Sequence, residues 1–289
     1  MKTLNKLGCA VALALAAIGS AQASVLMTDW VFNPNGGGFE KGQVVGEYLD
    51  INGQGFIQLT PAGAGSFTFT EHAVFNLTQA DSTGKLFPTT FPGGNISAIF
   101  EATGSGQLNG SFQFTSGTIR MYQNPTNGQY GSTGGIYGAN LGKQIAYFDV
   151  LAGGGGNVDA NGSPINNGRV TVHAEAAAGR LAPGYFFNKD GVDLSTQPMF
   201  AFAFTNANTL SNPNSKATPN LVKEVACQFA GFTGPGCQGR SVYKTKVGEH
   251  FFIGGNGQFK LAEVPEPGSV ALFGIALAGI GALRRRKAA

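Results

Sequence analysis

The sequence predicts an all-β fold: a β-sandwich-like single domain with Gly/Asn-rich loops, flanked by an N-terminal signal peptide and a C-terminal transmembrane helix. Short aromatic and β-branched runs recur along residues 24–263, and Gly, Asn and Pro separate them. In Phe67-Thr68-Phe69-Thr70, apolar and polar side chains alternate, as they do in a strand with one buried face. The 45 glycines are about twice the usual share, which suits a fold with many turns.

The N-terminus has the three parts of a secretory signal peptide. Two lysines precede an apolar run over residues 7–18, and a short motif of small residues follows it. A helix of this length rises only ~18 Å, whereas the hydrocarbon core of a bilayer is ~30 Å thick. We therefore expect signal peptidase to cleave between Ala23 and Ser24. Residues 1–23 are then the signal peptide, and the rest of the chain is exported.

Thirteen runs between the two ends have the composition of strands. They cover residues 25–32, 44–51, 56–60, 66–77, 96–102, 107–115, 118–123, 145–151, 170–176, 199–205, 241–247, 250–254 and 258–264. Helix signals are confined to residues 174–180 and 221–228, and residues 153–168 and 206–219 are predicted to be surface loops. Strands at this spacing favour a β-sandwich, and the length of residues 24–263 fits one large all-β domain as readily as two small ones.

The C-terminus carries three features in a fixed order over residues 264–289. Pro265, Glu266 and Pro267 form an extended, exposed segment, because each proline fixes φ and lacks a backbone donor. The apolar stretch that follows would form ~21 Å of helix, which is barely enough to span a bilayer. The basic cluster after it should stay cytoplasmic by the positive-inside rule, so the rest of the chain lies on the outer side. That cluster consists of Arg284, Arg285, Arg286 and Lys287.

This arrangement resembles the PEP-CTERM sorting signal of bacteria that make extracellular polysaccharide. The resemblance implies that membrane enzymes called exosortases recognise Pro265, Glu266 and Pro267. It further implies a transient inner-membrane association, removal of the helix and basic tail, and release to the cell surface or extracellular matrix. Residues 29–38 and 47–53 also resemble a flocculation-associated group of PEP-CTERM proteins, which implies a role with extracellular polysaccharide in flocculation or biofilm formation.

Removal of the two end segments reverses the net charge. The whole chain has 19 basic and 16 acidic residues, a formal net charge of +3. Six of the basic residues lie in the signal peptide and the C-terminal basic cluster, whereas all 16 acidic residues lie between Asp29 and Glu266, so the mature protein keeps 13 basic and 16 acidic residues and is near −3. We therefore expect no nucleic-acid partner. Its uncharged polar residues suit hydrogen bonding to sugars, and they equally suit a plain turn-rich β domain.

Cys227 and Cys237 are the only cysteines that remain after signal removal. Because exported proteins meet an oxidising compartment, we expect them to form a disulfide. Closing this short loop should stabilise the fold by roughly 2 to 3 kcal/mol. A metal site is the weaker alternative, since neither cysteine has a nearby histidine or a second close cysteine.

The sequence contains no complete catalytic motif. No serine lies in a nucleophile elbow, and His72, His173 and His250 are isolated from one another. We therefore predict a protein that is not an enzyme and carries no cofactor. Residues 157–162 match the opening of a calcium loop but lack its first Asp and final Glu, so a flexible loop is the better interpretation. A carboxylate pair assembled by folding stays open, with Glu40, Glu47, Glu71, Glu101 and Glu175 as unranked candidates.

Three functions fit these features. The leading one is a non-enzymatic surface or matrix protein that is held with exopolysaccharide and promotes flocculation or biofilm formation. The alternative is a carbohydrate-binding module that stacks sugar rings on Trp30 or on tyrosines such as Tyr122, Tyr130 and Tyr137. The third is a secreted polysaccharide hydrolase that uses a carboxylate pair.

Overall fold

The computed structural model describes residues 25–82, 95–124, 130–165, 167–211, 213, 220–239 and 241–264. The chain divides into two compact units. One unit joins Met1–Val25 to Glu263–Ala289, and nearly all of it lies outside the described residues. The other unit, Leu26–Ala262, is the body of the protein. Among the described residues, no helix combines the length and the apolar character that crossing a membrane requires.

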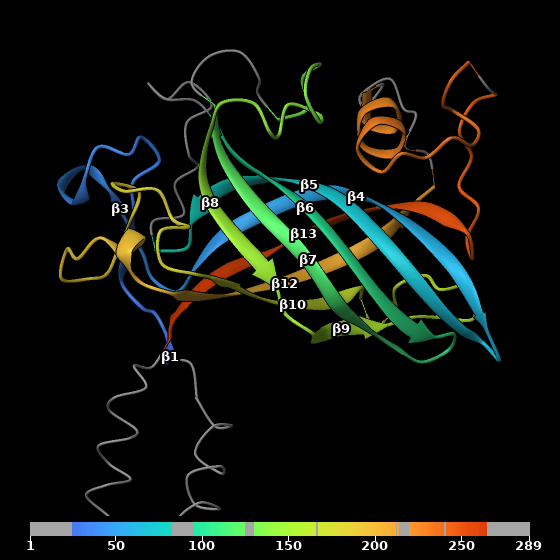
Figure 1. Cartoon of the computed structure of the whole chain (residues 1–289), viewed down its shortest axis with the longest axis horizontal. Helices are drawn as coiled ribbons and strands as arrows, with labels where there is room; N and C mark the ends of the chain where they lie inside the picture. The colour runs from blue at the N-terminus through green and yellow to red at the C-terminus, as the bar shows by residue number, and fades with distance from the viewer. Residues whose placement is uncertain are drawn as a thin grey trace, which may run out of the picture. The chain divides into compact units, whose positions relative to one another are not determined.

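A ten-stranded sheet dominates the body (Figure 1). Its order is β1-β13-β12-β10-β8-β7-β6-β5-β4, and β9 lies beside β10 and β7. In addition, β4 pairs with β13, from Tyr48 opposite Lys260 to Gln58 opposite His250, so the sheet closes on itself. The strands are β1 (Val25–Leu26), β4 (Tyr48–Gly63), β5 (Ser66–Ala80), β6 (Asn95–Gln107), β7 (Ser111–Asn124), β8 (Lys143–Val150), β9 (Gly153–Asn157), β10 (Arg169–Ala176), β12 (Met199–Leu210) and β13 (His250–Glu263).

The all-β prediction is confirmed, but the expected sandwich of two stacked sheets is wrong, because one continuous sheet forms and closes. The prediction failed because glycines inside strands resemble the turn residues that separate strands. The strands predicted over residues 250–254 and 258–264 form a single strand, β13, which ends at Glu263, and Gly257 lies inside it. A Cβ at Gly257 would overlap the carbonyl oxygen of Phe204 on β12. This glycine therefore allows two strands to approach closely in a strongly curved sheet.

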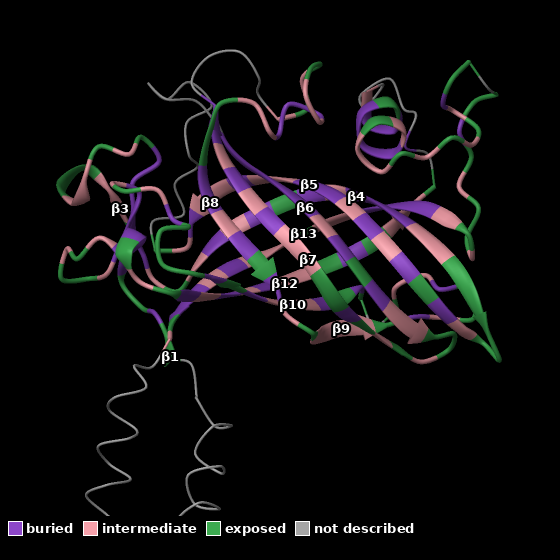
Figure 2. Cartoon of the chain, in the orientation of Figure 1, coloured by how far each residue is buried: buried purple, intermediate pink, exposed green. Residues whose placement is uncertain are grey.

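Alternating side chains fill the inside of the closed sheet. Phe69 of β5 packs edge-on against Phe114 of β7, with ring centroids 5.6 Å apart. Phe148 of β8 packs in the same way against Phe259 of β13, at 5.5 Å. The buried and exposed bands that alternate along the strands in Figure 2 reflect this pattern. The main hydrophobic core thus lies within the ring of strands.

Part of the outer face is covered by η4, a π-helix over Leu221–Phe229. Its Val225 and Ala226 are fully buried, in a second hydrophobic cluster that includes Phe56 of β4 and Val74 of β5. Both strand residues face away from the interior, since they alternate with inward neighbours. The helix predicted over residues 221–228 is therefore confirmed, as a π-helix.

Other boundary predictions were less accurate. Residues 174–180 form no helix, because Ala174 and Ala176 continue the inward face of β10. The strand predicted over residues 241–247 is absent from the described part of that segment, where Lys246 makes only an isolated bridge to His250. The two predicted loops are partly strand, since one contains β9 and the other contains the end of β12.

A small three-stranded sheet, in the order β11-β2-β3, completes the body. Its strands are β2 (Trp30–Phe32), β3 (Gln43–Val45) and β11 (Phe186–Phe187). The ring of Trp30 stacks on Phe186 with centroids 6.4 Å apart, and both side chains are fully buried. Two short 3-10 helices, η2 (Phe39–Lys41) and η3 (Leu194–Thr196), lie in the connections. Trp30 is therefore a core residue.

Candidate functional site

Two neighbouring chambers lie inside the closed sheet, each with a cavity volume of about 50 Å³. Four residues line both of them: Glu71, Phe75, Val170 and Thr205. They come from β5, β10 and β12, whose inward side chains meet inside the ring. Most of the remaining lining is aliphatic or aromatic. Glu71 and Thr205 are therefore polar groups in an otherwise largely apolar space.

Glu71 is placed inside by the alternation of β5. It shares the inward face with Phe69 and Ala73, and only 7% of its surface is exposed. Its neighbours in register are Ile57 on β4 and Ala102 on β6, which carry no charge. Among the described residues, none donates a hydrogen bond to the carboxyl group or pairs with it. Burial raises the pKa of Glu71 from 4.5 to about 7, so the group is half ionised near neutral pH.

The other four carboxylate candidates do not join Glu71. Glu101 lies on the opposite face of the sheet, where its Oε1 is 3.1 Å from Nη2 of Arg120. Glu47 pairs with Lys260 at 2.8 Å. Glu40 and Glu175 are exposed, on η2 and on β10 respectively. Of the five predicted candidates, the fold therefore brings only Glu71 into a cavity.

The histidines are dispersed over the outer face. His72 packs against Phe229 of η4, and burial lowers its pKa although the charge of Glu101 raises it. His250 packs against Phe232 and has a pKa lowered mainly by burial. His173 lies beside Phe202, with ring centroids 5.4 Å apart. In the described ranges, no three His, Cys, Asp or Glu side chains cluster in a way that could hold a metal ion.

The segment proposed as a possible calcium loop covers one chamber. Val158, Gly162 and Pro164 line that chamber. The carboxylate of Asp159 accepts hydrogen bonds from the backbone N–H groups of Asn161 and Ser163 at 2.8 and 2.9 Å. Asp159 therefore stabilises the turn that closes this end of the interior.

A shallow groove crosses the outer face over β5, β4, β13 and β12, and we call it the outer groove. Its volume of about 710 Å³ is in the range typical of ligand pockets. The half-buried ring of Phe204 lies in it, with Nζ of Lys260 5.9 Å from the ring centroid. Arg169 and Asp50 add one charge of each sign. Uncharged polar side chains supply most of the rest: Asn52, Thr78, Gln79, Asn206, Asn256 and Gln258.

The aromatic residues that the sequence suggested for sugar stacking have other roles. Trp30 and Tyr137 are buried, and the hydroxyl of Tyr130 donates to Oε1 of Gln54 at 2.7 Å. Tyr122 is half-buried beside Gln144. Among the lining residues of the outer groove, Phe204 is the aromatic one, and it lies in the strand predicted over residues 199–205.

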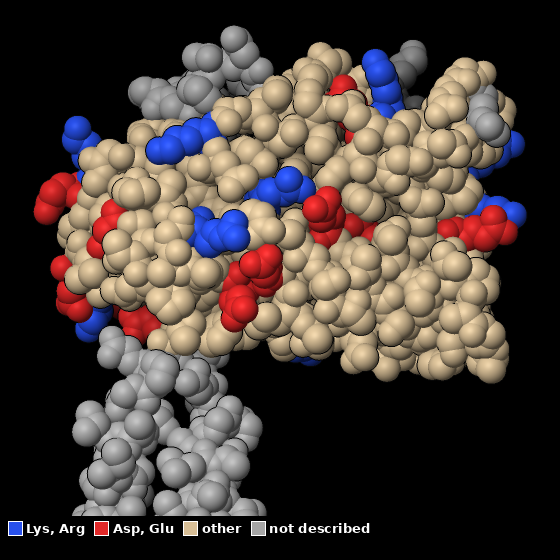
Figure 3. All heavy atoms as spheres, viewed as in Figure 1, with Lys and Arg blue, Asp and Glu red and all other residues tan. Residues whose placement is uncertain are grey.

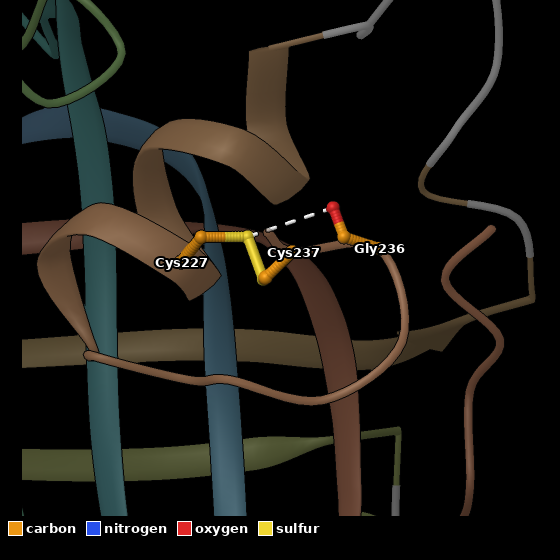
Figure 4. The surroundings of a disulfide bond; sticks show 3 residues. All are labelled: Cys227, Gly236 and Cys237. Atoms are coloured by element: carbon orange, nitrogen blue, oxygen red, sulfur yellow. Dashed lines mark hydrogen bonds between the residues drawn. A yellow bond between two sulfur atoms is a disulfide. The ribbon is translucent and has the colours of Figure 1, made fainter. Parts of the chain in front are cut away.

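Cys227 and Cys237 form the predicted disulfide, with their Cα atoms 5.6 Å apart (Figure 4). Cys227 belongs to η4, and Cys237 lies in the loop that follows the helix. The bond therefore fastens this loop to the helix that covers the outer face of β4 and β5.

The remaining predicted site residues lie outside the described residues. They are Ala23 and Ser24 at the expected signal cleavage site, Pro265, Glu266 and Pro267 of the sorting motif, and the basic cluster of Arg284, Arg285, Arg286 and Lys287.

Comparison with protein families locates the sorting signal. Residues 263–287 match the model of the PEP-CTERM protein-sorting motif. No curated protein and no solved structure matches the chain. The match defines the class as an exported, cell-surface-associated protein that is sorted by an exosortase. Within that class, this chain is an exosortase substrate whose body is a closed antiparallel sheet.

Proposed function

We propose that the mature protein is held with exopolysaccharide at the cell surface or in the matrix, where it promotes flocculation or biofilm formation without acting as an enzyme. The sorting motif over residues 263–287 supports this proposal, because it implies export of the body to the cell surface through an exosortase. Signal peptidase would remove residues 1–23. A transient inner-membrane association would precede processing by the exosortase.

The surface chemistry of the body supports contact with a neutral polymer. Charged side chains are sparse on the face that Figure 3 shows. The outer groove offers amide and hydroxyl groups, which can both donate and accept hydrogen bonds, beside the ring of Phe204. Sugars present hydroxyl groups and apolar ring faces, so this combination suits them.

The outer groove also favours a second candidate, a carbohydrate-binding module that recognises one defined glycan. A module of this kind binds one sugar sharply and saturably, whereas a matrix protein binds the bulk polymer through many weak contacts. Glycan-array binding followed by calorimetric titration of the mature protein separates the two candidates.

Deletion of the gene, followed by complementation with variants, tests the matrix role. The deletion strain should lose floc or biofilm mass, and the wild-type gene should restore it. Phe204→Ala should restore less than Phe202→Ala, a matched control on the same outward face of β12 that does not line the outer groove. Unchanged flocculation in the deletion strain would refute the proposal. If both variants restored flocculation equally, the outer groove would have no part in the proposed role.

A further inference from the structure

The inside of the closed sheet is not completely filled. Inward-facing Ile57, Val170, Ala203 and Ile253 line the chambers, and a water-sized probe still reaches 8% of the surface of each. By contrast, Phe148 on the inward face of β8 lines neither chamber and is fully buried. Protein interiors are normally close-packed, with few voids larger than a water molecule. The space around Glu71 is therefore a distinct feature of this fold.

Two polar groups face this space from separate walls. Glu71 lies on β5 and Thr205 on β12, and the strands β4 and β13 stand between them in the closed order. In the part of the chain that the structure describes, neither the carboxyl group of Glu71 nor the hydroxyl group of Thr205 has a hydrogen-bond partner. Buried carboxylates are normally paired or hydrogen-bonded. The ionised carboxylate of Glu71 only accepts hydrogen bonds, whereas the hydroxyl of Thr205 has one donor and two acceptor positions, so the two groups together offer more acceptors than donors.

The volume and lining restrict the chemistry of an occupant. Together the two chambers are smaller than the roughly 150 Å³ cavity known to hold benzene, so a sugar ring does not fit. A ring with several hydroxyl groups would also leave most of them unpaired against Phe75 and Val170. A short alkyl chain matches the apolar walls. An ammonium group supplies three donors and a positive charge, which a carboxylate and a hydroxyl oxygen can accept.

We propose that the interior of the closed sheet is a binding site for a short-chain primary alkylamine, whose ammonium group pairs with Glu71 and donates to Thr205 while its alkyl chain packs on Phe75 and Val170. The site lies inside the closed sheet, and although Thr205 also lines the outer groove, the assignment does not depend on the proposed matrix role. Of the ten strands, β4, β5, β6, β7, β8, β10, β12 and β13 form the closed ring. A closed sheet of eight strands is of a size that holds either packed side chains or one small ligand. Because Glu71 has no hydrogen-bond partner among the described residues, we expect a small ligand in this interior.

Calorimetric titration of the mature, disulfide-bonded protein near pH 8 tests this assignment, with ethylamine as the probe. At that pH most of Glu71 is ionised and the amine is protonated. We expect saturable binding of one ethylamine, at least about tenfold tighter than ethanol, which has a similar shape but no charge. Glu71→Gln should abolish the preference for the amine, and Thr205→Val should weaken the binding of the amine several-fold. Glu175→Gln, an exposed change on the outer face of β10, should leave binding intact.

Ala203→Leu gives a second test that does not touch the acid. The larger side chain fills one chamber and should reduce the affinity for ethylamine at least about tenfold. Buried Trp30 fluorescence checks that each variant is folded. Two outcomes would overturn the proposal: no saturable heat with the folded wild-type protein, or equal affinity of wild type and Glu71→Gln. The first result would mean that the chambers do not bind the amine, and the second would mean that its ammonium group does not pair with Glu71.

Discussion

Replacement of Glu71 by Gln should change the pH dependence of stability. Burial raises the pKa of Glu71 from 4.5 to about 7 in the folded protein. The folded state therefore binds this proton more tightly than the unfolded chain does. The stability from this group is present below about pH 4.5, and it is lost as the pH rises through about 7. The sign is opposite to that of a carboxylate stabilised by a salt bridge.

The size of the effect follows from the same pKa change. Each tenfold change in proton affinity corresponds to about 1.4 kcal/mol, so the full effect is about 3 kcal/mol. The neighbours Gly55, Ile57 and Ala102 are uncharged, and a Cβ at Gly55 would lie only 3.3 Å from Oε1 of Glu71. The cause is thus desolvation, which salt screens only weakly.

Urea unfolding of the mature protein, followed by the fluorescence of its single tryptophan, measures this difference. Glu71→Gln should be more stable than wild type by up to about 3 kcal/mol near pH 8 and nearly equal to it near pH 4. Because the lowered pKa of His72 affects both proteins alike, subtracting the two curves isolates Glu71. Glu175→Gln serves as the exposed control. Parallel curves for wild type and Glu71→Gln would refute the placement of this acid in an apolar interior.

Three further changes test the packing of the body in the same unfolding assay. Replacing Cys227 and Cys237 by Ala should cost roughly 2 to 3 kcal/mol, a difference that a reductant should abolish. Glu224→Ala should cost about 2 kcal/mol, because the buried carboxylate accepts the N–H of Tyr137 at 2.8 Å; a neutral result would contradict that role. Gly257→Ala should cost about 1 to 3 kcal/mol through its clash with β12, and an unchanged midpoint would disprove the close strand approach.

Local patterns were sufficient to predict much of the strand content. The alternation of Phe67 and Phe69 with Thr68 and Thr70 identified β5 and its buried face, and the helix that contains Cys227 was found from composition. Closure of the sheet depends instead on the pairing of β4 with β13, which lie about two hundred residues apart in the chain. No local signal specifies such long-range register, and glycines inside curved strands resemble turn residues.

The candidate site, like the fold, could be predicted from local sequence patterns only in part. Glu71 was among five unranked carboxylates. It follows Phe67 and Phe69 at a spacing of two residues, however, and side chains at that spacing lie on the same, inward face of a strand. This two-residue spacing was the feature of the sequence that could have singled out Glu71. It could not show that the face encloses a cavity, because the opposite wall comes from β10 and β12, which lie far from β5 in the sequence. The sorting motif needed no fold at all, since it is read as a linear segment.

Mass spectrometry of the mature protein recovered from culture tests the central claim, which is export and exosortase processing of the chain. Reading both termini and any attached mass should show a start at Ser24 and loss of the apolar stretch and basic cluster that follow Pro265-Glu266-Pro267. A variant with Pro265 and Glu266 replaced by Ala should keep them. An intact C-terminus in the wild-type protein, or identical trimming of the variant, would contradict the account.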